Sequence, residues 1–399
     1  MHFRDLFGAV AVAAGVAGTA SGYQQSPTVK TDALAAVAVA KLAVYSSLNS
    51  ENRTKGNTCT LATAVKRREW SVREGSLSPA ERIQYTNAVN CLMTKPSRFK
   101  LPAVKSRFDD FVAVHINQTF TIHGTASFLS WHRHFVWTYE KALREECGYK
   151  GYQPYWNWGR WANDPLNSPI FDGGVASMGG NGIYAEHLCT DALANGINCI
   201  PPGAGGGCVK TGPFTNYTVS MGPIFPTLRS ADVVAIGFDK DPFQTYNPHC
   251  MKRDVSSWLS SRFLQDQNVT DLLTGSPNIT SFQSTMQGDF PKGFYGVHAA
   301  GHYTIGGDPG GDFFVSPADP AFYLHHGQID RTWWIWQNQK PAERTSAIGG
   351  TITIFNNPPS RDGTLEDPIN LDVLAATIPT SQAMSTLGLT GGPYCYIYV

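Results

Sequence analysis

The stretch GVHAAGHYTIGGDPGGDFFVSPADPAFYLHHGQIDRTWWIWQ, residues 296–337, decides the fold class of this chain. Its composition predicts two helices separated by a glycine- and proline-rich loop. The first helix carries His298 and His302, which lie four residues apart and therefore one turn apart on the same face. Two imidazoles in this arrangement can bind one metal ion.

The residue after the first of these histidines tells against a zinc protease. That mechanism requires a glutamate there as general base, whereas this chain has Ala299. A site built from imidazoles alone suits copper, zinc, iron or nickel, and a paired site of three plus three imidazoles suits copper best. Such a site requires further histidines near the pair.

Two upstream helices are predicted to bring further histidines into the core. A helix over residues 105–117 places His115 on its apolar face. A longer helix over 126–146, with Thr125 as a possible cap and Gly148 as its stop, places His132 in the middle of its apolar stripe. His123 lies in the loop between them, and His134 is rotated about 200° from His132 and should face elsewhere.

Other elements are predicted from caps and composition. Ser78-Pro79-Ala80-Glu81 is a capping box that begins a helix ending near Leu92, and Asp319 with Pro320 begins the last histidine helix. Residues 159–247 are rich in Gly, Pro and Asn and indicate loops, and the runs at 350–355 and 394–399 resemble β-strands. The predicted fold is mainly α, with long irregular loops and a few short strands.

Composition excludes several classes of protein. Among 399 residues, 31 Lys+Arg balance 31 Asp+Glu, and 42% are hydrophobic against 16% charged. This balance fits neither a disordered chain nor a cationic nucleic-acid binder. Without an internal low-complexity linker, we expect one domain over residues 21–399.

Three features predict secretion. Residues 1–20 have the early charge, apolar run and small residues of a signal peptide. Eight cysteines without a Cys-x-x-Cys pair favour disulfides. Glycosylation sequons occur at Asn52, Asn117, Asn216, Asn268 and Asn278.

The segment 31–48 has helical composition and allows two interpretations. It is either a short pro-segment or the first helix of the fold. Because Lys41 interrupts its apolar run, we expect no membrane span and a soluble extracellular protein.

Five segments carry a family resemblance: HGTASFLSWHRHF (123–135), PYWNW (154–158), SPIFDG (168–173), HAAGH (298–302) and DPAFYLHHGQIDRTWW (319–334). They resemble the type 3 copper family of tyrosinases, catechol oxidases and molluscan-type haemocyanins, over a core of about residues 69–337. Chain length resembles that of short secreted fungal polyphenol oxidases. The resemblance implies a four-helix bundle housing two copper ions, with dioxygen as co-substrate.

By that resemblance, His115, His123 and His132 bind copper A, and His298, His302 and His326 bind copper B. Helical spacing also favours His326 over His325, because Phe322, Ile329 and Trp333 lie on the same face as His326. We expect His325 to contact the ligand histidines without binding copper itself, or to line the substrate pocket. Asp330, one turn from His326, is expected to orient a ligand imidazole, with a salt bridge to Arg331 as the alternative. Hydrogen-bonded core histidines are the alternative for the whole set.

The resemblance also identifies pocket residues. Related enzymes with strong monophenol hydroxylation often have Asn where this chain has Ala299, and Glu near the position of Gln287. Tyr303 should narrow the pocket, and Phe313 is either a ring covering copper A or a packed loop aromatic. Thr121, two positions before His123, replaces a cysteine that many relatives link to the corresponding histidine by a thioether. That crosslink should therefore be absent here. These differences favour oxidation of o-diphenols to o-quinones over monophenol hydroxylation.

Three alternatives remain open at this point. The chain could hydroxylate monophenols fully, prefer o-aminophenols, or bind oxygen without chemistry as haemocyanins do. A single unit without tandem repeats tells against the last. We expect small phenols as partners, and neither nucleic acid nor membrane.

Overall fold

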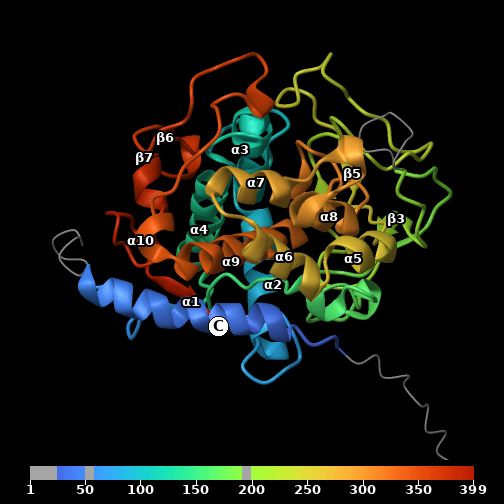
Figure 1. Ribbon diagram of the computed structural model, residues 1–399. Helices are drawn as coiled ribbons and strands as arrows, with labels where there is room; N and C mark the ends of the chain where they lie inside the picture. The colour runs from blue at the N-terminus through green and yellow to red at the C-terminus, as the bar shows by residue number, and fades with distance from the viewer. Residues whose placement is uncertain (1–24, 50–57, 191–198) are drawn as a thin grey trace, which may run out of the picture.

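Four helices form the centre of the computed structural model, which describes residues 25–49, 58–190 and 199–399 (Figure 1). They are α3 (Arg107–Ile122), α4 (Phe128–Cys147), α8 (Gly296–Ile305) and α9 (Ala321–Gln339). Helix α4 packs on both α3 and α9, and α8 packs on α9. The predicted mainly α fold with a central bundle is confirmed.

Capping residues explain where the helices begin. Ser78 and Glu81 form the predicted capping box of α2 (Pro79–Thr94), which packs on α3 and α4. Ser106 and Asp109 form a second capping box on α3. Helix α3 continues five residues beyond the predicted end at Asn117, because no proline or glycine follows Asn117 before Ile122, and Thr119 and Ile122 are buried.

The starts of α4 and α9 differ slightly from prediction. Ser127, not Thr125, is the N-cap of α4, and its side chain makes no capping bond. The Thr125 hydroxyl instead donates to the carbonyl oxygen of Thr121 at 2.9 Å. Helix α9 has Pro320 at its N-cap, although Asp319 still accepts from the amide of Ala321 at 2.9 Å. Gly148 ends α4 in the left-handed conformation, as predicted.

Helix α1 (Val29–Leu48) is the first helix of the fold, which decides between the two interpretations of this segment. It lies across the lower side of the bundle in Figure 1 and packs along α9 and α6. Lys41 donates to the carbonyl oxygen of Gln339 at 2.7 Å. Among the described residues, α1 alone has the length and apolar composition of a membrane-crossing helix, despite Lys41.

Four shorter helices surround the bundle: α5 (Ser257–Phe263), α6 (Asp266–Gly275), α7 (Ile279–Gln287) and α10 (Pro341–Arg344). Helix α7 packs on α8 and α5 packs on α8, so the helix with the His298/His302 pair is covered on two sides.

Short strands pair in twos. The pairs are parallel β1 (Val65–Arg67) with β8 (Tyr396–Tyr398), and antiparallel β2 (Gly182–Tyr184) with β3 (Gly206–Val209), β4 (Thr218–Val219) with β5 (His249–Cys250), and β6 (Pro368–Ile369) with β7 (Ile378–Pro379). The predicted strand at 394–399 is confirmed as β8. The predicted strand at 350–355 is wrong.

In place of that strand the chain forms a single bridge, Thr351 with Asp362, and a 3-10 turn over Ile354–Asn356. Phe355 and Asn356 both have positive φ, at 50° and 56°, which a strand cannot accommodate. Side-chain bonds from Thr353 to Pro358 and Ser360 close this loop locally.

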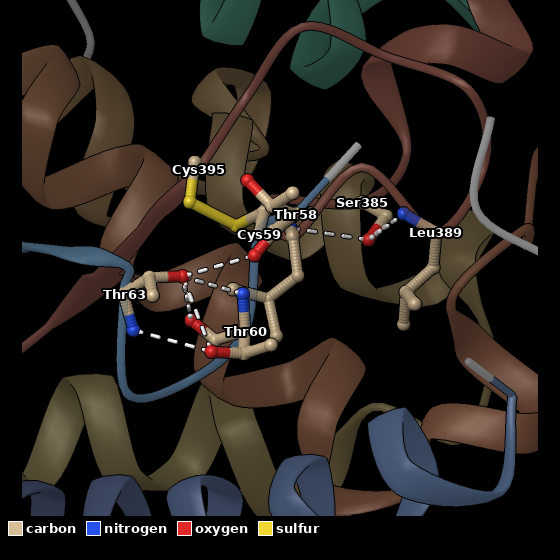
Figure 2. The surroundings of a disulfide bond; sticks show 8 residues. Thr58, Cys59, Thr60, Thr63, Ser385, Leu389 and Cys395 are labelled. Carbon is tan, nitrogen blue, oxygen red and sulfur yellow. Dashed lines mark hydrogen bonds between the residues drawn. A yellow bond between two sulfur atoms is a disulfide. The ribbon is translucent and has the colours of Figure 1, made fainter. Parts of the chain in front are cut away.

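All eight cysteines are paired in four disulfides: Cys59–Cys395, Cys91–Cys147, Cys189–Cys199 and Cys208–Cys250. Figure 2 shows Cys59–Cys395, which joins the segment before β1 to the segment that enters β8. The amide of Val65 donates to the carbonyl oxygen of Cys395 at 3.0 Å. The disulfide and this hydrogen bond therefore hold the segment before β1 against the segment that enters β8.

In the region 159–247 the described residues form loops, 3-10 turns and the strands β2, β3 and β4, in agreement with the predicted loops. Of the sequons, Asn117, Asn216 and Asn278 are exposed, and Asn268 is half-buried at the start of α6. Asn52 and the predicted signal peptide at 1–20 lie outside the described residues.

Candidate dinuclear metal centre

Three histidines from α3, α4 and the turn between them form a first group. His115 lies on α3, His123 is the residue that ends α3, and His132 lies on α4. One ring nitrogen of each lies within 4.8 Å of those of the others, and all three side chains are buried. The predicted association of these residues is therefore present in the structure.

Backbone carbonyls fix the tautomer of each ring in this group. The Nδ1 atoms lie 2.8, 2.9 and 2.7 Å from the carbonyl oxygens of Phe314, Thr119 and Phe128 respectively. A carbonyl only accepts, so each Nδ1 carries the proton and each Nε2 presents a lone pair. The Nε2 atoms of His115 and His132 have no hydrogen-bond partner among the described residues.

The second group comes from α8 and α9. The Nε2 atom of His302 lies 3.2 Å from Nε2 of His298 and 3.1 Å from Nε2 of His326. Burial lowers the pKa of all three imidazoles well below the usual value, and the neighbouring histidines lower it further. Three neutral rings whose nitrogens converge this closely form a donor set for a cation.

His325 also lies in this group, but both of its nitrogens are used elsewhere. Its Nε2–H donates to the carbonyl oxygen of His298 at 3.0 Å, and its Nδ1 accepts from the indole N–H of Trp158 at 3.1 Å. Burial lowers the pKa of His325 to about 3, so the ring stays neutral. Gly301 makes room for this ring, since a Cβ there would lie 2.1 Å from His325 Cε1.

The two groups adjoin across α4 and α9. The rings of His132 and His326 stack with centroids 4.5 Å apart, and His123 lies 6.0 Å from His298. Phe322 stacks on the other side of His326, at 4.1 Å. The buried lone pairs without partners are costly in a metal-free protein, and two bound metal ions would satisfy them. The donor set therefore fits a dinuclear centre.

Asp330 does not orient a histidine and does not pair with Arg331, so both predictions for this residue are wrong. Its carboxylate instead accepts from Arg133 Nε at 2.6 Å and from Arg67 Nη1 at 3.4 Å, and the hydroxyl groups of Tyr396 and Tyr398 donate to it. Asp330 thus ties α9 to α4, β1 and β8, which stabilises the position of the histidine helices.

A cavity of about 240 Å³ opens onto both groups through His123, His298 and His302. The four predicted pocket residues, Gln287, Ala299, Tyr303 and Phe313, all line it. The Phe313 ring packs on His123 with centroids 4.7 Å apart and also contacts Phe314. No cysteine is left for a histidine crosslink, because all eight form disulfides.

Both the oxygen and the nitrogen of the Gln287 side-chain amide form hydrogen bonds. Its oxygen accepts from the amide of Gly124 at 2.8 Å, and its nitrogen donates to the carbonyl oxygen of Gln283 at 3.2 Å. The side chain therefore ties α7 to the turn that carries His123.

Asp312 is a cavity residue that the sequence did not indicate. One carboxylate oxygen accepts from the amides of Ile224 and Phe225, and the other from those of Phe314 and Val315. Asp312 thereby positions the loop whose Phe314 carbonyl orients His115. Two of its partners lie in a loop almost ninety residues upstream, so no local motif marked it. Trp158, whose indole N–H donates to His325, was not predicted as a site residue either.

A helical bundle that presents two adjoining groups of three imidazoles, beneath an apolar cavity, defines a dinuclear metalloprotein. Residues 105–339 match the family model described as the common central domain of tyrosinase. The chain belongs to the tyrosinase family of type 3 copper proteins, whose members contain two copper ions and use dioxygen as co-substrate.

Similar proteins come from fungi. The chain is 42% identical to Tyrosinase P of Aspergillus terreus over 83% of this chain and 91% of that protein. It is 36% identical to N-acetyl-6-hydroxytryptophan oxidase ivoB of Emericella nidulans, over 85% and 93% of the two chains. A point mutant of polyphenol oxidase from Thermothelomyces thermophila superposes with a TM-score of 0.84 at 40% identity, covering 94% of this chain and 98% of that one. The protein is therefore a copper oxidase that acts on phenolic substrates.

Proposed function

We propose that this protein is a secreted o-diphenol oxidase that converts catechols to o-quinones, with at most weak monophenol hydroxylation. His115, His123 and His132 bind copper A, and His298, His302 and His326 bind copper B. The observation that carries the proposal is that the ring nitrogens of buried histidines converge within each group, while the Nδ1 atoms of the first group are held by carbonyls.

Two copper ions held by these histidines would supply the redox chemistry. In the overall reaction two diphenols and one dioxygen give two o-quinones and two waters, so that four electrons and four protons balance. The chain provides the enclosure for this reaction. Phe313 and Tyr303 form aromatic walls beside the histidines, and Ala299 leaves space for a substrate ring next to His298. An apolar enclosure of this kind orients the ring and excludes water.

The polar groups of the cavity support diphenol over monophenol oxidation. Hydroxylating a monophenol requires a group that accepts the phenol proton. Ala299 has no polar side-chain atom, and the amide of Gln287 is bonded at both ends. Four backbone donors around Asp312 already occupy its two oxygens.

Secretion is supported by sequence and disulfides together. Residues 1–20 are the proposed signal peptide, followed by one domain over 21–399. Four disulfides are typical of an oxidising compartment, and the exposed sequons Asn117, Asn216 and Asn278 are accessible to glycosylation. A shift in mass on deglycosylation of protein secreted by a fungal host tests this part.

Oxygen uptake by the copper-loaded protein tests the activity. We expect uptake with 4-methylcatechol and little with 4-methylphenol under identical conditions. Prompt uptake with both identifies a tyrosinase, whereas uptake with 2-aminophenol alone identifies an aminophenol oxidase. Reversible oxygen binding without oxidation of any substrate would contradict the proposed enzyme. His326→Ala serves as the inactive control.

A further inference from the structure

The outer part of the cavity is lined by apolar side chains and is larger than one phenol ring requires. Beyond the histidines, its lining includes Phe225, Phe290, Ile354 and Phe355, none of which the activity itself uses. Engineered cavities of about 150 Å³ hold a benzene ring. At about 240 Å³ the present cavity has room beyond one phenol ring.

The lining of the cavity has few charged side chains. The described residues that form it include no lysine or arginine, and their one carboxylate, Asp312, is already bonded to four backbone amides. Lys292, two residues from Phe290, is 80% exposed and pairs with Asp289 at 2.6 Å. At the mouth of the cavity a substrate carboxylate would therefore lose its water without gaining a lysine or arginine partner, which is costly.

Phe355 is an exposed aromatic side chain held in an unusual conformation at the mouth of the cavity. It is 72% exposed, although it lines the cavity, and its backbone φ is 50°. Its amide donates to the carbonyl oxygen of Gly124 at 3.0 Å. A Cβ on Gly124 would lie 2.9 Å from the Phe355 ring, so only glycine allows the ring to lie there, one residue from His123. Left-handed, non-glycine residues of this kind concentrate at ligand sites.

We propose that the cavity selects neutral phenols with an apolar, ring-sized substituent opposite the reacting hydroxyl groups, and that Phe355 contacts this substituent. The inference rests on the proposed function, because it concerns the substrate of the same site. A diphenol whose hydroxyl groups face the histidines points its 4-substituent toward the mouth. There Phe355, Phe290 and Ile354 offer apolar surface. Amino-acid phenols and phenolic acids are disfavoured, because the described lining offers their carboxylate no lysine or arginine.

Two matched pairs of substrates test the selection. The first pair is 4-phenylcatechol and 4-methylcatechol, and the second is 3-(3,4-dihydroxyphenyl)propanoate and its methyl ester. We expect kcat/KM to favour the phenyl compound in the first pair. In the second we expect the ester to be favoured by about tenfold or more. Equal values within both pairs would overturn the proposal.

Phe355→Ala tests the contact residue, with Tyr184→Ala as matched control. Tyr184 is also 72% exposed but does not line the cavity. We expect Phe355→Ala to raise KM for 4-phenylcatechol roughly twofold to tenfold, the range of one aromatic contact, with kcat unchanged. Phe355→Leu should restore part of the loss. An unchanged KM in Phe355→Ala, or an equal rise in Tyr184→Ala, would refute the assignment.

Binding separates this inference from the proposed activity. Calorimetric titration of the reduced copper protein with 4-phenylcatechol under nitrogen measures affinity without turnover. If 4-methylcatechol is not oxidised in air, the proposed function fails, whereas tighter binding of the phenyl compound and its loss in Phe355→Ala still support the inference. Equal binding of the phenyl and methyl compounds overturns it.

Discussion

The indole N–H of Trp158 donates to Nδ1 of His325 at 3.1 Å. This bond, with the one from His325 Nε2 to the His298 carbonyl oxygen, uses both nitrogens of the ring. Of two adjacent histidines on α9, we therefore propose His326 as the copper ligand. The first prediction follows from this difference.

Substitutions of His325 and His326 should change the copper content of the protein differently. His326→Ala removes one of three ligands, and we expect copper content to fall from about two to about one per chain with loss of activity. His325→Gln retains an acceptor and a donor, and we expect it to keep both copper ions with reduced activity. Metal analysis by mass spectrometry checks both. Loss of copper in His325→Gln with retention in His326→Ala would reverse the assignment.

Ala299→Asn should raise monophenol hydroxylation. The substitution adds an amide beside His298 in the cavity, where it can hold a water that accepts the phenol proton. We expect the ratio of oxygen uptake with 4-methylphenol to that with 4-methylcatechol to rise about tenfold, near the low end of proton-transfer effects. Ala299→Val is the control for size alone. An equal rise in the valine variant would show that polarity is not the cause.

Asp330→Asn should lower stability and change its acid dependence. Burial opposes the charge on Asp330, but Arg133, Arg67 and the two tyrosine hydroxyls together lower its pKa below the usual value. A carboxyl with a lowered pKa stabilises the fold above its unfolded pKa and loses that effect as pH falls below about 4. We expect a loss of about 3–5 kcal/mol in the variant at pH 7, because the buried guanidinium of Arg133 loses its carboxylate partner and that of Arg67 keeps only Glu140.

Chemical unfolding of the wild type and Asp330→Asn between pH 3 and pH 7 measures this effect. The difference between the two proteins should shrink toward pH 3. The surface pair of Lys340 with Glu343 supplies a control, since Glu343→Gln should change stability by under about 1 kcal/mol. A pH-independent difference would show that packing, not charge, is lost in Asp330→Asn.

Asp312→Asn should lower stability and impair copper A, through the loop that carries Phe314. An asparagine nitrogen in place of one oxygen leaves two buried amides unpaired, which costs about 2–5 kcal/mol. Burial raises the pKa of Asp312 to about 6, so its stabilising effect falls as pH rises from about 4 to 6. The variant should lack that slope. Thermal unfolding at pH 4 and pH 7 and copper analysis measure both effects; unchanged copper content would contradict the positioning role.

Cys395→Ser should loosen β8 from α9. The Cys59–Cys395 disulfide joins residues 336 positions apart, and its loss should cost about 2–5 kcal/mol. Because Tyr396 and Tyr398 bond Asp330, we expect faster hydrogen exchange in β8 and in the turn of α9 around Asp330. Hydrogen exchange with mass spectrometry checks this, with the double variant Cys59→Ser and Cys395→Ser as control for a free thiol. If hydrogen exchange became faster only in residues near Cys59, the predicted coupling of the disulfide to Asp330 would be contradicted.

The histidine helices were predictable because their signals are local. Four-residue spacing sets His298 and His302 on one face, and capping residues such as Ser78 mark helix starts by geometry within one turn. His132 in an apolar stripe is likewise buried wherever that helix packs. Errors at the end of α3 and the start of α4 arose because no helix breaker marks the first boundary, and the residue at the second, Ser127, makes no capping bond.

The 350–355 run was mistaken for a strand because its β-branched residues satisfy strand propensity. Phe355 lies against Gly124, whose place depends on α3, so tertiary contact overrode that propensity. Asp330 was misjudged for a similar reason. Its partners come from residue 67, residue 133 and the final strand, and no short-range pattern encodes them.

Helical periodicity and spacing act within a few residues, so the sequence was enough to predict most of the helices and to place candidate histidines on them, and the family resemblance divided six of these histidines into two sets. Tertiary packing was needed to establish which nitrogens are occupied, which loops form the cavity and what Asp312 and Asp330 hold in place. Those interactions join segments tens to hundreds of residues apart, and their energies depend on burial and on partners that meet only after the chain has packed.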